Sequence, residues 1–178
     1  MGWGAYVIVV VVALVLIGAT VVLSLLAWQR QARGIVHGLV AHGESVKASL
    51  KTTDILVSRL ATGSVEDLLA FAEPASEDRS VLAEVASRMR LVGLELADQR
   101  LPRRMWALGD HLSAAASALA EECGRVGEAP SADVLDALLS LDLERVRGEL
   151  SAVEREIGPV VAAYRLGDTD VYGGGLYI

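Results

Sequence analysis

An uncharged, largely apolar stretch from Val7 to Leu26 constrains this chain more than any other feature of its sequence. About 20 such residues suffice for a helix to cross the hydrocarbon core of a bilayer, where lipid offers no partner to an unpaired backbone amide. Trp3 and Trp28 flank the stretch, as the aromatic belts at the two membrane interfaces would require. The sequence therefore predicts a transmembrane helix over residues 6–28, with the lipid bilayer as a partner.

A cleavable signal peptide is the alternative interpretation of this stretch. Such a signal has a basic segment before a shorter apolar core and a cleavage site of small residues after it. No Lys or Arg precedes Val7, and no such site follows Leu26. We therefore favour an uncleaved signal-anchor.

The orientation follows from basic residues near the predicted span. Arg30 and Arg33 lie just after it, whereas no Lys or Arg lies before it. The positive-inside rule then predicts a single-pass protein of the cell membrane, with residues 1–5 outside and the C-terminal domain in the cytoplasm. Cys123 is the only cysteine, so the chain has no internal disulfide, which agrees with a cytoplasmic domain.

Small residues recur along the predicted span at heptad-like spacing. A stripe of small side chains allows a second transmembrane helix to pack closely. Small residues are also common in any span, and the sequence does not decide between these interpretations. The stripe consists of Ala13, Thr20, Ser24 and Ala27.

The rest of the chain predicts an all-α domain, because it is rich in Leu, Val and Ala while aromatic residues make up only 4% of the sequence. A heptad seam favours a long juxtamembrane helix over residues 29–63, whose glycines indicate either a flexible neck or sites of close helix approach. Pairing of the seam within one chain and self-association between chains both remain open. The seam comprises Val36, Leu39, Gly43, Val46, Leu50, Thr53, Val57 and Leu60.

An antiparallel, coiled-coil-like helical bundle is predicted over residues 64–166. Ser64 and Asp67 are spaced to cap a short helix over about residues 65–72, and Ser76 begins the next helix. Pro102 separates that helix from a third. The two apolar stripes are Leu82, Val85, Met89, Val92 and Leu96, and then Met105, Leu108, Leu112, Ala116, Leu119, Cys123 and Val126.

The longest helix is expected to start at Ser131, after a linker over residues 127–131. Pro159 predicts a kink or a break near Gly158. Residues 167–178 form an irregular, glycine-rich tail without a helical pattern. The seam of this helix comprises Leu139, Leu143, Val146, Leu150, Val153, Ile157, Val160 and Tyr164.

Residue patterns that carry chemistry are missing from the sequence. The chain has no nucleotide-binding glycine loop, zinc-protease motif or serine-hydrolase motif, and His37 and His42 are five residues apart rather than the four that a helical metal pair needs. The net charge of −7 opposes nucleic-acid binding, which depends on Lys and Arg. We expect no enzyme activity, catalytic residue, cofactor, metal site or nucleic-acid partner.

Two segments are candidates for docking on a partner. Arg100, Arg103 and Arg104 with nearby Trp106 form a basic patch that would suit anionic headgroups or an acidic protein, although a solvated turn between helices is the simpler interpretation. The tail concentrates apolar residues that suit a partner's groove or sheet edge, although it would also suit folding back on the bundle or fraying. These tail residues are Val171, Tyr172, Leu176, Tyr177 and Ile178.

The sequence therefore favours a non-enzymatic accessory or scaffold subunit of a membrane protein assembly, whose helical cytoplasmic domain binds other membrane or cytoplasmic proteins. The alternative is a membrane-tethered regulator or sensor whose bundle relays a signal. The few residues before the predicted span leave no room for an external sensing module, so the regulator is the less favoured of the two hypotheses.

Overall fold

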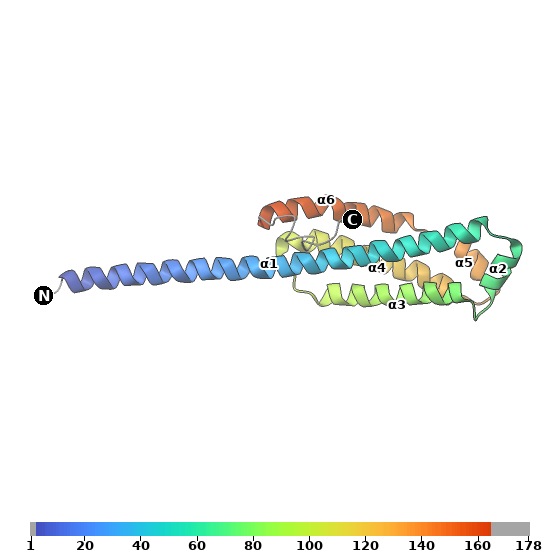
Figure 1. The fold of residues 1–178 in the computed structure, drawn as a ribbon, viewed down its shortest axis with the longest axis horizontal. Coiled ribbons are helices and arrows are strands. Elements are labelled where there is room, and N and C mark those ends of the chain that lie inside the picture. The colour runs from blue at the N-terminus through green and yellow to red at the C-terminus, as the bar shows by residue number, and fades with distance from the viewer. Residues whose placement is uncertain (1–2, 165–178) are drawn as a thin grey trace, which may run out of the picture.

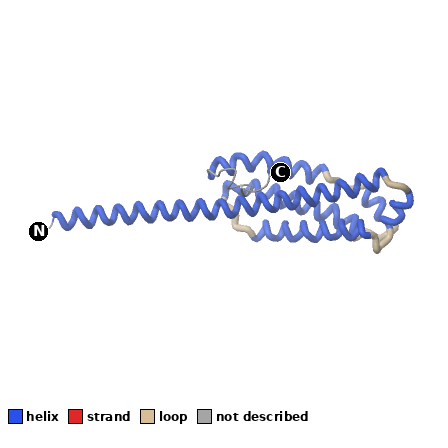
Figure 2. The backbone as a smooth tube through the Cα atoms, viewed as in Figure 1, coloured by secondary structure: helices blue, strands red, loops and turns tan. Residues whose placement is uncertain are grey.

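The computed structural model describes residues 3–164, and every regular element in this part of the chain is a helix (Figures 1 and 2). Side chains are described for residues 16–24 and 26–164. The prediction of an all-α fold is confirmed. In chain order the elements are α1 (Trp3–Thr62), α2 (Val65–Ala72), α3 (Glu77–Asp98), the 3-10 turn η1 (Arg103–Met105), α4 (Trp106–Gly127), α5 (Val134–Leu139) and α6 (Glu144–Tyr164).

Four long helical segments form an antiparallel bundle. The second half of α1, then α3, α4 and α6, alternate in direction, and α4 contacts each of the other three (Figure 1). The first half of α1 projects alone from one end of this bundle (Figure 1). We call residues 3–31 of α1 the rod. The near end is the end of the bundle from which the rod projects, and the far end is the opposite end, which carries α2 and α5.

The predicted seams pack against one another within a single chain. In α1 every seam residue is buried except Val57, which is half-buried. The stripes of α3 and α4 are buried throughout. These residues form one continuous hydrophobic core with the buried residues of α6, so the second half of α1 is an integral part of the bundle.

Glycines do not interrupt α1, which remains helical through Gly34, Gly38 and Gly43. Gly43 is buried, and a Cβ added to it would lie 4.0 Å from Cδ1 of Leu112 on α4. At 4.0 Å this would be an ordinary van der Waals contact, so Gly43 packs against α4 without an approach that only glycine allows.

The predicted long helix starting at Ser131 is wrong. Residues 131–133 form a turn, and two helices, α5 and α6, follow in place of one. Leu139 does not belong to the seam, because it ends α5 with 85% of its side chain exposed. The longest helix is α1. Of the kink or break expected near Gly158, the break is absent, since α6 continues to Tyr164. The carbonyl that Pro159 leaves without a donor belongs to Arg155, which is exposed, so solvent can satisfy it.

Arg79 is the one buried charged side chain among the described residues, with 6% exposed. Its guanidinium donates to the carbonyl oxygens of Ala72 at 3.3 Å, Gly127 at 3.3 Å and Ala129. These carbonyls lie at or just after the C-terminal ends of α2 and α4, where helices lack their own donors. Arg79 therefore joins two helix ends at the far end of the bundle.

The predicted cap at the start of α2 is confirmed. The Ser64 hydroxyl accepts from the Asp67 amide at 3.2 Å, and the Asp67 carboxylate accepts from the Ser64 amide at 2.7 Å. The hydrogen bonds from the Ser64 amide and hydroxyl lower the pKa of Asp67. A group with a lowered pKa stabilises the fold above its unfolded pKa, and this contribution disappears as the pH falls through its folded pKa.

We expect Ser64→Ala to lower the free energy of unfolding by about 1 kcal/mol at neutral pH. The cost should shrink in acid, because protonation of Asp67 weakens the same cap in the parent protein. Urea denaturation at several pH values measures both effects. Ser151→Ala, at an exposed position inside α6, is the control and should be neutral. An equal loss in the two variants would contradict the role of the cap.

Candidate functional site

Over its described residues 16–24 and 26, the rod presents apolar side chains in every direction. Successive residues on a helix turn by about 100°, so these exposed residues surround the axis and leave no polar face. The hydroxyl of Thr20 donates to Leu16 O and Ile17 O, and that of Ser24 to Thr20 O, so neither needs an outside partner. The exposed apolar residues are Leu16, Ile17, Val21, Val22, Leu23 and Leu26.

Among the residues whose side chains are described, 16–24 and 26–164, no helix is both long and apolar enough to be a candidate for crossing a membrane. The transmembrane helix expected over residues 6–28 therefore stays a prediction.

The predicted interface residues lie around the junction of rod and bundle. Trp28 is 49% exposed, and its ring packs against buried Tyr164 at the end of α6, with 5.2 Å between the ring centroids. Arg30 and Arg33 are exposed. In the small-residue stripe, Thr20, Ser24 and Ala27 are exposed. The side chains of Trp3 and Ala13, and the whole predicted docking tail, lie outside the described residues.

The loop between α3 and α4, which we call the near-end loop (residues 99–106), brings the predicted basic patch to the near end of the bundle (Figure 1). Arg100, Arg103 and Arg104 are exposed there. The Trp106 side chain is 55% exposed, and its Nε1 donates to the carbonyl of Leu101 at 2.9 Å. The sequence identified this cluster but not its position at the near end of the bundle, which depends on how α3 and α4 pack against α1.

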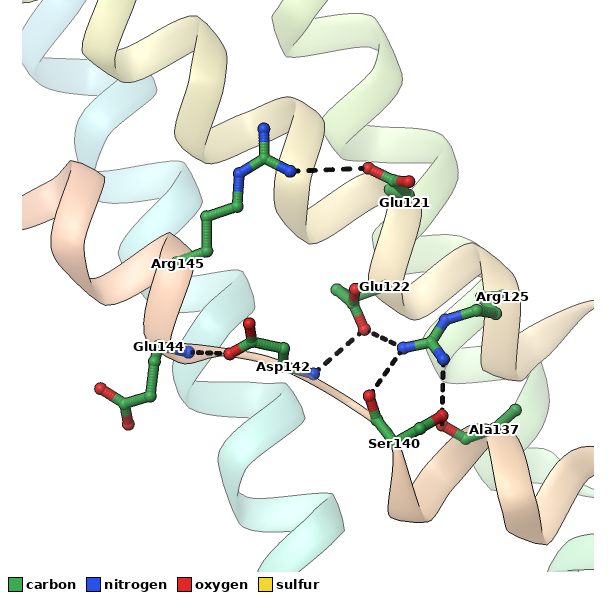
Figure 3. Close-up of polar contacts among 8 residues, drawn as sticks. All are labelled: Glu121, Glu122, Arg125, Ala137, Ser140, Asp142, Glu144 and Arg145. Carbon is green, nitrogen blue, oxygen red and sulfur yellow. Dashed lines mark hydrogen bonds and ion pairs between the residues drawn. The ribbon is translucent and has the colours of Figure 1, made fainter.

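A polar network that the sequence did not predict holds the connection between α5 and α6 (Figure 3). Arg125 of α4 pairs with Glu122 and donates to Ser140 Oγ at 2.6 Å and to Ser140 O at 3.0 Å. Glu122 also accepts from the Asp142 amide at 3.1 Å, and Asp142 accepts from the Glu144 amide at 3.0 Å. The network fixes the connection to α4 and marks the start of α6.

Exposed apolar side chains also gather on the short helices of the far end. Val65 and Leu69 of α2 are 72% and 61% exposed. Leu139 lines a groove of about 710 Å³ together with Leu68 and residues at the end of α1. These side chains form a surface that a partner protein could cover.

Cys123, His111 and His42 each contact a residue of a neighbouring helix. Cys123 contacts the Thr53 hydroxyl at 3.5 Å, and burial raises the pKa of its thiol, which disfavours the nucleophilic thiolate. His111 contacts Glu149 at 2.7 Å across α4 and α6, and His42 lies 3.8 Å from Glu95 across α1 and α3. His37 is exposed. These pairs join neighbouring helices.

Comparison with known proteins gives no relative. No family model matches the chain, and no curated protein or solved structure is significantly similar to it. The functional argument therefore depends on the described surfaces.

Proposed function

We propose that this chain is a non-enzymatic, single-span membrane protein that acts as an accessory or scaffold subunit of a membrane assembly through its helical domain. The observation that carries the proposal is the continuity of α1, which contributes both the rod with its exposed apolar side chains and one wall of the bundle core. In this proposal the rod lies in the bilayer and the bundle binds partner proteins in the cytoplasm.

Solvation supports the membrane part of the proposal. The uncharged stretch begins at Val7, ahead of the first residue whose side chain is described. The large apolar residues in its described part are 49–65% exposed. Soluble proteins rarely expose a contiguous apolar surface larger than a few hundred Å². A single partner helix would cover only one side of the rod, whereas lipid would cover all of them. Arg30 and Arg33 favour a cytoplasmic bundle.

The far-end surface supports the scaffold part of the proposal. Val65, Leu69 and Leu139 are more exposed than most apolar residues of the bundle, and they lie at the end farthest from the rod. Partner proteins would reach this end without competing with the membrane. A membrane-tethered regulator is the second candidate, because any rotation of the rod would be transmitted through α1 directly to the core.

Membrane fractionation and native-size analysis of the full chain test the proposal together. We expect the chain to resist carbonate extraction, and in mild detergent to migrate in a complex larger than its own micelle. Leu69→Asp with Leu139→Asp should release the partners while membrane retention stays unchanged, because both side chains are exposed.

Leu91→Asp with Leu94→Asp is the control, since these leucines are also exposed, at 58% and 66%, and lie on α3, away from α2 and α5. Extraction of the parent chain by carbonate would disprove the anchor. A parent chain that migrates alone would disprove the scaffold. Labelling of a C-terminal tag from outside intact cells would disprove the orientation.

A further inference from the structure

The arginines of the near-end loop differ from most others in the bundle. Six arginines of the bundle form ion pairs with carboxylates, namely Arg59, Arg88, Arg90, Arg125, Arg145 and Arg147. In the described part of the chain no ion pair involves Arg100, Arg103 or Arg104, although Asp98 and Asp110 lie close in sequence. Although the full sequence has 23 acidic and 16 basic residues, these three neighbouring arginines have no carboxylate partner among residues 3–164.

The loop that carries these charges lies at the end of the bundle from which the rod projects (Figure 1). A Cβ added to Gly38 of α1 would lie 3.8 Å from Nε2 of Gln99, so the loop begins beside Gly38. Along the helix, Gly38 is about 15 Å from Trp28, where the predicted span ends. Trp3 to Trp28 would span about 37 Å, which exceeds a hydrocarbon core of roughly 30 Å, so the rod should tilt. A tilt toward the loop would bring its side chains closer to the headgroups.

The conformation of the loop holds these side chains on the surface. Met105 is fully buried and its amide donates to Pro102 O at 2.8 Å, which closes the turn η1 with Arg103 and Arg104 exposed. The indole N–H of Trp106 is already satisfied by Leu101, while more than half of the side chain is exposed. Tryptophan beside arginine is a combination that suits the boundary between headgroups and hydrocarbon.

We propose that the near-end loop docks on anionic lipid headgroups of the same membrane that holds the rod, an inference that rests on the proposed anchor. Lipid phosphates would take the place of the missing carboxylate partners, and Trp106 would enter the interface. One basic residue near an anionic surface contributes about fivefold to a binding equilibrium, so three arginines should favour the docked arrangement by roughly a hundredfold. Docking would also select the direction of tilt.

Fluorescence of Trp106 in the full chain tests this inference. Trp3→Phe and Trp28→Phe leave Trp106 as the only tryptophan and keep an aromatic ring against Tyr164. The protein is reconstituted into vesicles of phosphatidylcholine alone or mixed with phosphatidylglycerol, each containing a lipid with a nitroxide on its headgroup. We expect stronger quenching in the anionic vesicles, and loss of the difference at about 0.5 M salt, where screening is strong.

Arg100→Gln, Arg103→Gln and Arg104→Gln together should abolish the difference between the two lipids. Arg88→Gln, Arg145→Gln and Arg155→Gln form the control, because they remove the same charge from exposed positions on α3 and α6. Equal quenching in both lipids, or an equal loss in the control, would overturn the inference and favour an acidic protein as the ligand. Carbonate-resistant retention in phosphatidylcholine vesicles reports the anchor separately, so failure of the anchor is distinguishable from failure of the loop.

Discussion

Replacing Leu16 and Ile17 together by arginine is expected to release the chain from the membrane while the bundle stays folded. These residues lie near the middle of the stretch from Val7 to Leu26. An arginine at the centre of a span costs roughly 2.5–3.5 kcal/mol on insertion scales, so two should cost about 5–7 kcal/mol. The bundle should be unaffected, because the two side chains are 61% and 60% exposed. The carbonate-resistant fraction of the full chain and its thermal denaturation measure the two effects.

Leu91→Arg with Leu94→Arg is the matched control for this result. These leucines are also exposed, at 58% and 66%, but they lie on the surface of α3, a helix of the bundle and not of the rod. The control should remain in the membrane. Equal release of both variants would show that added positive charge, rather than its position in the rod, is responsible. Full retention of the first variant would contradict the membrane anchor.

Leu150→Pro should unfold α6 and lower the free energy of unfolding by more than about 3 kcal/mol. Leu150 is 6% exposed in the middle of α6, so proline would remove a helix hydrogen bond, clash with the carbonyl of Val146 and delete a core side chain. Most domains have only about 5–15 kcal/mol of stability. Far-UV circular dichroism and urea denaturation should show lost helix and a lower midpoint.

Glu144→Pro provides the control, because the first residue of a helix tolerates proline. It removes the hydrogen bond from the Glu144 amide to Asp142 and the exposed ion pair of the Glu144 carboxylate with Arg147, which together should cost about 1–2 kcal/mol. Similar losses for the two prolines would show that α6 is not an essential wall of the core. A far-UV spectrum of the parent chain with strong β character would contradict the fold.

Periodicity allowed much of the bundle to be predicted. The seam from Val36 to Leu60 and the stripe from Leu82 to Leu96 repeat every three or four residues, because one face of each helix packs against neighbours. Ser64 and Asp67 identified a helix start from two residues alone, since a capping box is local chemistry. Features determined by residues close together in the sequence could therefore be predicted.

Features determined by tertiary contacts were not accessible. The seam of α6 continues in register back to Leu139, so the pattern concealed the break between α5 and α6 at Ser140. Ser140 and Asp142 were the only local signals of that break. The residues that bind them, Arg125 and Glu122, lie on α4. Arg79 looks like a surface residue in the sequence, but the carbonyls that keep it buried come from residues far along the chain. The position of Arg100 at the near end of the bundle likewise depends on packing.

The continuity of α1 has a consequence for how the length of this protein can change in evolution. One residue inserted between Arg30 and Ala32 would rotate the rod by about 100° relative to the core and move it by about 1.5 Å. The arginines of the near-end loop, which stay with the core, would then face a different side of the rod. Seven inserted residues would nearly restore the phase, because they make close to two full turns. Length variation among descendants of this chain should therefore fall in the connections between helices, or occur in multiples of about seven within α1.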